Sequence, residues 1–205
     1  METLRIYPSS VNDRFIARAA EIMRRGGIII YPTDTLYAIG CSALCQQAIE
    51  KVCRLKDIDT KRDTLSIVCS GISQASEYAR IDNGAFNIMR SHTPGPYTFV
   101  LPAAGSLPKA FKTRRTVGVR IPDNVIARRI AEELGCPILS TSIPTENLEY
   151  EEIVQPGEIA LRFEPLQPEA MIDGGEGSDI PSTVVDLTDS SQPEIIREGA
   201  GPIDF

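Results

Sequence analysis

Hydrophobic and polar positions alternate between two periods along the chain. Apolar residues at helical spacing predict amphipathic helices over residues 12–25, 44–55, 73–79, 85–89, 125–134 and 157–162. Short apolar or alternating runs predict strands over residues 28–31, 65–69, 97–101, 117–121, 137–141, 170–173, 183–187 and 194–197. Helices that alternate with strands predict an α/β sheet covered by helices, and exclude all-α and all-β domains.

The chain length is consistent with one domain. It has 205 residues and 42% hydrophobic content, enough to bury a sizeable core. No internal repeat or low-complexity linker divides it, so we expect a single domain over residues 1–205.

The sequence has no run of 18 apolar residues and no apolar signal region near its first residue, so we expect a cytoplasmic protein without a membrane span. Five cysteines at spacings that match no zinc pattern predict free thiols and no protein-bound metal. Cys41 ends a polar segment, but no base is in evidence beside it, which argues against a nucleophile.

Charge is distributed unevenly around a formal net value of −7. Residues 1–130 carry 19 Lys and Arg against 11 Asp and Glu, whereas residues 131–205 carry 2 against 17. The asymmetry suggests that the first part of the chain meets an anionic ligand. The acidic remainder argues against a large nucleic-acid footprint, although it also fits a solvated face.

A ligand-site pattern follows the predicted strand over residues 28–31. Pro32 ends the strand, and Thr33, Asp34, Thr35 and Tyr37 then supply hydroxyls and a carboxylate. Ligands collect where strands of α/β sheets end. A polar turn that satisfies its own hydrogen bonds is the alternative for this segment alone.

Six segments in one order resemble the YrdC/YciO family, the threonylcarbamoyl-adenylate synthases. They are Pro-Thr-Asp-Thr-Leu-Tyr-Ala-Ile-Gly from residue 32, Pro-Gly-Pro-Tyr-Thr-Phe-Val-Leu from 94, Val-Arg-Ile-Pro from 119, Ser-Thr-Ser from 140, Pro-Ser-Thr-Val-Val-Asp from 181 and Ile-Arg-Glu-Gly-Ala-Gly from 196. The resemblance covers nearly the whole chain.

The resemblance implies a twisted mixed sheet with helices on both faces and a concave cleft. It also implies a nucleotidyltransferase that uses ATP with Mg²⁺, L-threonine and bicarbonate to make threonylcarbamoyl-adenylate for tRNA modification. The family is associated with double-stranded RNA binding as well, which gives the alternative of a nucleotide- or RNA-binding module with little or no synthase activity. The oligomeric state is not indicated.

Family positions carry over to residues with two expected kinds of role. Lys56 and Arg62 would stabilise departing pyrophosphate, and Ser142 would orient the amino acid. Residues expected to bind nucleotide or substrate are Thr33, Thr35, Tyr37, Lys61, Thr98, Arg120, Ser140, Ser182 and Arg197.

Three of the assignments have a structural alternative. Arg120 could form an ion pair with Asp123, Ser182 could simply start a strand, and His92 could either bind phosphate or cap a helix end.

Two positions depart from the family pattern. The arginine of its Lys-x-Arg pair is Ile58 here, and the asparagine after its Ser-Thr-Ser strand end is Pro144. Proline offers neither a side-chain amide nor a backbone N–H. The pattern resembles the YciO branch, and Arg62 and Asn147 are the candidates to replace the two lost groups.

Overall fold

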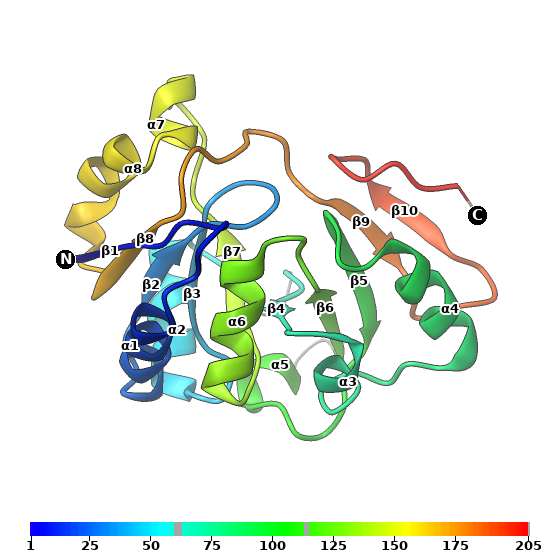
Figure 1. Ribbon diagram of the computed structural model, residues 1–205. Helices are drawn as coiled ribbons and strands as arrows, with labels where there is room; N and C mark the ends of the chain where they lie inside the picture. The colour runs from blue at the N-terminus through cyan, green and yellow to red at the C-terminus, as the bar shows by residue number, and fades with distance from the viewer. Residues whose placement is uncertain (60–62, 113–114, 205) are drawn as a thin grey trace.

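The computed structural model describes residues 1–59, 63–112 and 115–204, and its centre is one mixed sheet (Figure 1). Its strands are β1 (Glu2–Arg5), β2 (Ile29–Tyr31), β3 (Ala38–Ser42), β4 (Ser66–Val68), β5 (Tyr97–Pro102), β6 (Thr116–Arg120), β7 (Ile138–Ser142), β8 (Ala170–Asp173), β9 (Thr183–Asp186) and β10 (Glu194–Arg197). The spatial order is β1-β8-β2-β3-β7-β4-β6-β5-β9-β10. Strands far apart in sequence are therefore neighbours in the sheet.

Parallel and antiparallel pairs are both present. The pairs β1–β8, β2–β8, β4–β6 and β5–β9 are parallel, whereas β2–β3, β3–β7, β4–β7, β5–β6 and β9–β10 are antiparallel. The expectation of a mixed α/β sheet is confirmed.

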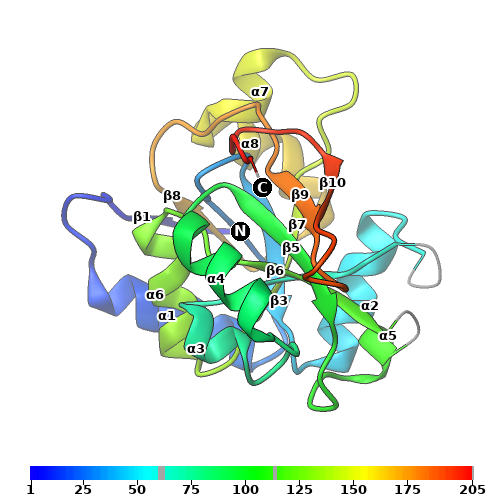
Figure 2. The same ribbon diagram turned by 90° about the vertical axis from the view of Figure 1, so that its right-hand side faces the viewer.

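Helices flank this sheet. They are α1 (Asp13–Arg24), α2 (Gln46–Leu55), α3 (Ile72–Ala75), α4 (Asn83–His92), α5 (Lys109–Lys112), α6 (Val125–Leu134), α7 (Tyr150–Val154) and α8 (Pro156–Phe163), with the 3₁₀ turn η1 (Glu164–Leu166). Figure 2 shows α1, α3, α4 and α6 on one side of the sheet and α2 and α5 on the other. None of the described helices is long and apolar enough to cross a membrane.

Local sequence explains where the best-predicted helix begins and ends. The Asn124 side chain accepts hydrogen bonds from the backbone N–H groups of Ile126 and Ala127, at 3.0 and 3.1 Å, and so caps α6. Gly135 ends α6 with a φ of 74°, a left-handed conformation that favours glycine. Because these signals are local, the sequence predicts this helix over its full length.

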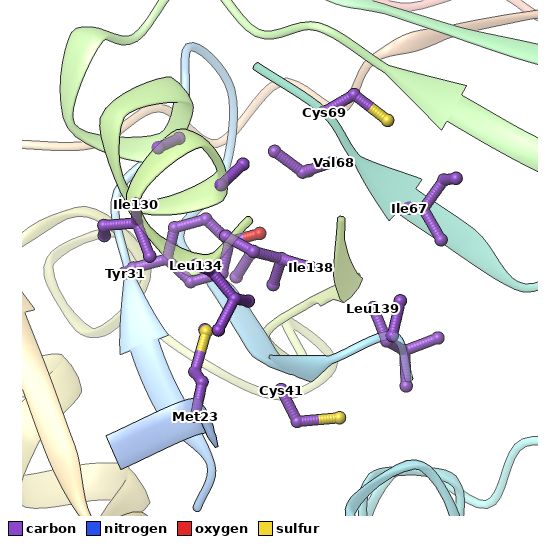
Figure 3. Packing of buried hydrophobic residues seen from close by; sticks show 14 of the residues in the cluster. Met23, Tyr31, Cys41, Ile67, Val68, Cys69, Ile130, Leu134, Ile138 and Leu139 are labelled. Carbon is purple, nitrogen blue, oxygen red and sulfur yellow. The ribbon is translucent and has the colours of Figure 1, made fainter. Parts of the chain in front are cut away.

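The core extends over both faces of the central strands (Figure 3). Cys41, Leu139 and Ile67 are paired in register across β3, β7 and β4, so their side chains share one face. Tyr31 and Ile138 lie on the side where α6 contributes Ile130 and Leu134 (Figure 3). Burial on both faces explains why these strands read as continuous apolar runs.

Sequence reasoning missed β1, β3, α5 and α7. The most consequential of these is β3, because it is the second half of the ligand-site segment. All its residues are buried, and the strand pairs with β2 and β7. Cys41 in β3 is fully buried, and burial raises the pKa of its thiol, which agrees with the argument against a nucleophile.

Candidate functional site

A cleft of about 300 Å³ crosses the sheet where β7, β4, β6, β5 and β9 lie side by side. Ser140, Ser66, Gly118 and Val100 pair in register across four of these strands, which places them on one face. A Cβ atom at Gly118 would lie 2.5 Å from the Ser66 hydroxyl, so only glycine keeps this part of the cleft floor open. The floor is therefore small and rich in hydroxyl groups.

Arg120, the last residue of β6, lines the cleft and is held by a carboxylate. Its Nη2 donates to Asp34 Oδ1 at 2.9 Å and to Thr35 Oγ1 at 3.0 Å. The two charged side chains are only 11% and 8% exposed. Asp34 Oδ2 also accepts the backbone N–H of Asp123 at 2.8 Å. The Arg120 Nε is buried and has no hydrogen-bond partner among the described residues.

The alternative of a structural ion pair for Arg120 is met, but Asp123 is the wrong partner. Asp123 instead lies 3.4 Å from Arg128 on the exposed surface, while Asp34 occupies the buried position beside Arg120. The partner comes from 86 residues earlier in the chain, which local sequence could not indicate.

Arg197, the last residue of β10, lines the same cleft but is held by neutral groups. Its Nη2 and Nε donate to the Ser182 carbonyl at 2.8 and 3.2 Å. Among the described residues no carboxylate lies within ion-pair distance of Arg197. Arg197 is exposed as a residue, but partial burial of its guanidinium and, to a smaller extent, the nearby Arg120 lower the pKa of that group. The uncompensated charge favours an anionic ligand here.

Hydroxyl groups occupy most of the remaining polar positions. The Thr98 and Ser182 hydroxyls lie 2.9 Å apart, and Ser140 Oγ accepts a hydrogen bond from the Tyr31 hydroxyl at 2.7 Å. Burial raises the pKa of Tyr31, so its hydroxyl remains a neutral donor. Ser142 ends β7, lines the cleft and is exposed. These groups suit a ligand with several hydrogen-bonding atoms.

Seven residues expected at the site line the cleft: Thr35, Thr98, Arg120, Ser140, Ser142, Ser182 and Arg197. Thr33 and Tyr37 do not. Thr33 Oγ1 donates to the Leu36 carbonyl at 2.7 Å and accepts from the Thr35 N–H at 3.0 Å. These bonds stabilise the loop between β2 and β3. The Tyr37 hydroxyl donates to the Gly175 carbonyl at 2.6 Å.

The three basic residues expected to bind phosphate are not among the described residues that line the cleft. Lys56 follows α2 at its C-cap, is half-buried and does not line the cleft. Burial lowers the pKa of its ammonium group, and the charge of Glu146 opposes that shift. Lys61 and Arg62 lie outside the described residues. Ile58, the position of the missing family arginine, does line the cleft.

The structure adds one residue that the sequence analysis missed and assigns places to three whose role was open. Ser66 was missed, although a polar residue that starts an apolar strand is a readable signal. Asp34 was expected as a carboxylate of the ligand-site segment, and its pairing with Arg120 becomes visible only in the structure. His92 Nδ1 lies 2.8 Å from the Ile88 carbonyl at the end of α4, which favours the helix-end alternative over phosphate binding. Asn147 is not among the residues that line the cleft.

In the part of the chain that the structure describes, no group of three or more His, Cys, Asp or Glu side chains could hold a metal ion. The hydrogen-bond donors on the described side chains of the cleft are hydroxyls and two guanidinium groups, and Asp63 adds one carboxylate. Such donors fit the oxygens of a carboxylate or a phosphate.

The mixed sheet and its cleft define an α/β protein whose cleft presents two guanidinium groups. The sequence model of the Sua5/YciO/YrdC family, described as telomere recombination, matches residues 21–199. The chain belongs to this family.

Relatives of two kinds are similar to the chain. YciO of Escherichia coli, described as uncharacterized, is 40% identical over 200 residues, which are 97% of this chain and 95% of YciO. The threonylcarbamoyl-AMP synthase of Bos taurus is 31% identical over 199 residues and is matched over 89% of this chain and 67% of its own.

Solved structures show the same relationship. The crystal structure of E. coli YciO superposes with a TM-score of 0.89 at 39% identity, with 98% of both chains covered. The structure of P. abyssi Sua5 complexed with L-threonine gives a TM-score of 0.83 at 28% identity, and covers 97% of this chain and 58% of that longer one. The family resemblance and the fold are thereby confirmed.

Proposed function

We propose that the protein makes threonylcarbamoyl-adenylate from ATP, L-threonine and bicarbonate, as a nucleotidyltransferase that serves tRNA modification. One observation carries the proposal. Thr35, Arg120 and the neighbouring pair Ser182 and Arg197 come from three distant parts of the chain and converge on one cleft, in a chain 31% identical to a threonylcarbamoyl-AMP synthase.

The proposed reaction needs no covalent bond to the enzyme. L-threonine and bicarbonate condense to a carbamate with loss of water. A carbamate oxygen then attacks the α-phosphorus of ATP, and the bond to the β-phosphate oxygen breaks to release pyrophosphate. Such a displacement depends on the alignment of the reactants and on neutralisation of charge.

The residues of the cleft suit these two tasks. Arg197, whose charge no described carboxylate compensates at short range, would neutralise phosphate oxygens. Arg120, fixed by Asp34 and Thr35, would orient a carboxylate or the carbamate, since its Nε still lacks an acceptor. Thr35 and Ser142 would orient the amino acid. Mg²⁺ would arrive with the phosphates of ATP, because the described cleft offers no carboxylate cluster for it.

A pyrophosphate-release assay tests the proposal. We expect release that requires ATP, L-threonine and bicarbonate together, and that falls when any one of them is omitted. Replacement of L-threonine by L-valine, which has nearly the same shape but lacks the hydroxyl, is the matched substrate control. Binding of ATP without threonine-dependent release would contradict the synthase activity.

That result would favour the second candidate, a nucleotide- or double-stranded-RNA-binding module of the same fold. Ile58 supports this alternative, because an apolar side chain lines the cleft where the family pattern has an arginine. Pro144 supports it as well, because it cannot supply the amide of the expected asparagine. Titration with a nucleotide and with a short RNA duplex, each without turnover, distinguishes the two ligands.

A further inference from the structure

The C-terminal segment, residues 197–202, is attached to the start of β9 through one buried hydroxyl. Thr183 is 1% exposed, and its Oγ1 accepts hydrogen bonds from the N–H groups of Gly199 and Gly201, at 3.0 and 3.1 Å. The same hydroxyl donates to the Gly201 carbonyl at 2.6 Å. A threonine hydroxyl has one donor and two acceptor sites, so its hydrogen-bonding capacity is used completely.

The segment lies in direct contact with the surface beneath it. A Cβ atom at Gly199 would come within 2.3 Å of the Pro181 carbonyl oxygen, and one at Gly201 within 2.4 Å of the Tyr97 ring. Ala200 N donates to the Pro181 carbonyl at 2.8 Å, and the Tyr97 hydroxyl donates to the Pro202 carbonyl at 2.7 Å. The backbone that follows Arg197 is therefore fixed at several points.

An irregularity in the β9–β10 ladder decides where Arg197 points. Ile195 pairs with Val185 but Arg197 pairs with Val184, so Ile196 is an extra residue in β10. In a regular ladder Arg197 would stand opposite Thr183, and its side chain would project from the other face. The bulge turns Arg197 to the face of Val184, which lines the cleft.

We infer that Thr183 is the positioning residue for Arg197: its hydroxyl holds residues 199–201 against β9 and thereby keeps the guanidinium in the cleft. The identity of the anion that Arg197 meets rests on the proposed function, whereas the position of Arg197 does not. Thr183 itself is not among the residues that line the cleft, so it acts only through Arg197.

The first test follows the Arg197 Nε–H group by NMR in the full-length protein. This group donates to the Ser182 carbonyl, so its proton should exchange with water more slowly than that of a free arginine side chain. Thr183→Val replaces the hydroxyl by a methyl group and leaves the N–H groups of Gly199 and Gly201 without their acceptor. We expect Thr183→Val to lose the protection of Nε–H and Thr183→Ser to retain it. Retained protection in Thr183→Val would overturn the inference.

Gly199→Ala leaves Thr183 intact, but its added methyl group would clash with the Pro181 carbonyl and displace the segment. It provides an independent check if Thr183→Val folds poorly. We expect it to lose the protection too. Protection that survives the added methyl group would show that Arg197 does not depend on the segment.

The second test is a double-mutant cycle, in which calorimetry measures the ATP affinity of Thr183→Val, Arg197→Ala and the double variant. We expect Thr183→Val to weaken binding about as much as Arg197→Ala, roughly tenfold, because a charge-assisted contact to phosphate is lost in both. The double variant should bind no more weakly than Arg197→Ala alone. An equal further loss in the double variant would mean that Thr183 acts on the whole fold and would refute the inference. A wild-type protein that does not bind ATP would refute the proposed function, while the exchange experiment would still decide the role of Thr183.

Discussion

Arg120 and Arg197 lie in one cleft, yet the protein holds them by opposite means. Arg120 pairs with the buried carboxylate of Asp34, and both side chains are almost fully removed from water. Arg197 donates to the carbonyl of Ser182, and its position depends on a bulge and on the C-terminal segment. A buried ion pair fixes geometry and cancels charge, whereas a guanidinium on a neutral carbonyl keeps its charge for a ligand. We therefore interpret the Arg120 side as the rigid part of the site and the Arg197 side as its anion-attracting part.

Removal of Asp34 gives the largest expected effect. Asp34→Ala leaves the Arg120 guanidinium buried without a counter-charge, and breaking such a pair costs about 3 to 5 kcal/mol of unfolding free energy. Urea denaturation measures this loss. Asp123→Ala is the matched control, because its exposed pair with Arg128 contributes about 0 to 1 kcal/mol.

The double variant Asp34→Leu/Arg120→Met sharpens this prediction. It removes both charges together, and we expect it to recover most of the stability lost in Asp34→Ala. Equal stability of Asp34→Ala and the wild type would show that the pair is not buried in solution.

Arg197→Ala should separate binding from stability. We expect the free energy of unfolding to change by no more than about 1 kcal/mol, since only hydrogen bonds to neutral groups are lost. ATP affinity should fall about tenfold, because the unpaired cation is removed. Calorimetry and urea denaturation on the same preparation check both parts. A loss of stability as large as that of Asp34→Ala would abolish the distinction between the two arginines.

Restoration of the two family positions should raise activity. Ile58 lines the cleft, so Ile58→Arg adds a third guanidinium for phosphate oxygens, and Pro144→Asn adds an amide donor and acceptor. We expect threonine-dependent pyrophosphate release from the double variant to exceed that of the native chain, with circular dichroism as the check on folding. Equal turnover would mean that other groups already replace the missing pair, with Arg62 and Asn147 the first to test.

Lys56 should have the smallest effect. It does not line the cleft, so we expect Lys56→Ala to weaken ATP binding by only about threefold, as for a partly screened charge. Burial lowers the pKa of Lys56 from the ordinary value of 10.5. Its contribution to binding is therefore complete below that lowered value and declines as the pH rises through it. Lys56→Ala should remove this part of the pH dependence, and a loss of affinity larger than that of Arg197→Ala would place the phosphates beside Lys56.

The sequence alone determined the elements and the polar groups available to the site. Helix α6 was predicted over its full span because its apolar residues recur at helical spacing and Gly135 ends it, and the structure adds the Asn124 cap. Most hydroxyls of the cleft were predicted as site residues because they lie in short motifs at strand ends. The family resemblance indicated that these motifs belong to one site. Such features depend on residues close in sequence, and one sequence is enough to read them.

Tertiary structure decided which of these groups act together. The partner of Arg120 is Asp34 rather than the nearby Asp123, because the loop that follows β2 reaches the end of β6 although β3, β7 and β4 lie between the two strands in the sheet. Thr33 and Tyr37 turned out to support the backbone. Arg197 reaches the cleft because one extra residue in β10 moves its side chain to the other face of the strand. The Thr183 hydroxyl binds the backbone that follows Arg197. Strand register and buried pairing join residues far apart in the chain, and no local pattern in the sequence contains that information.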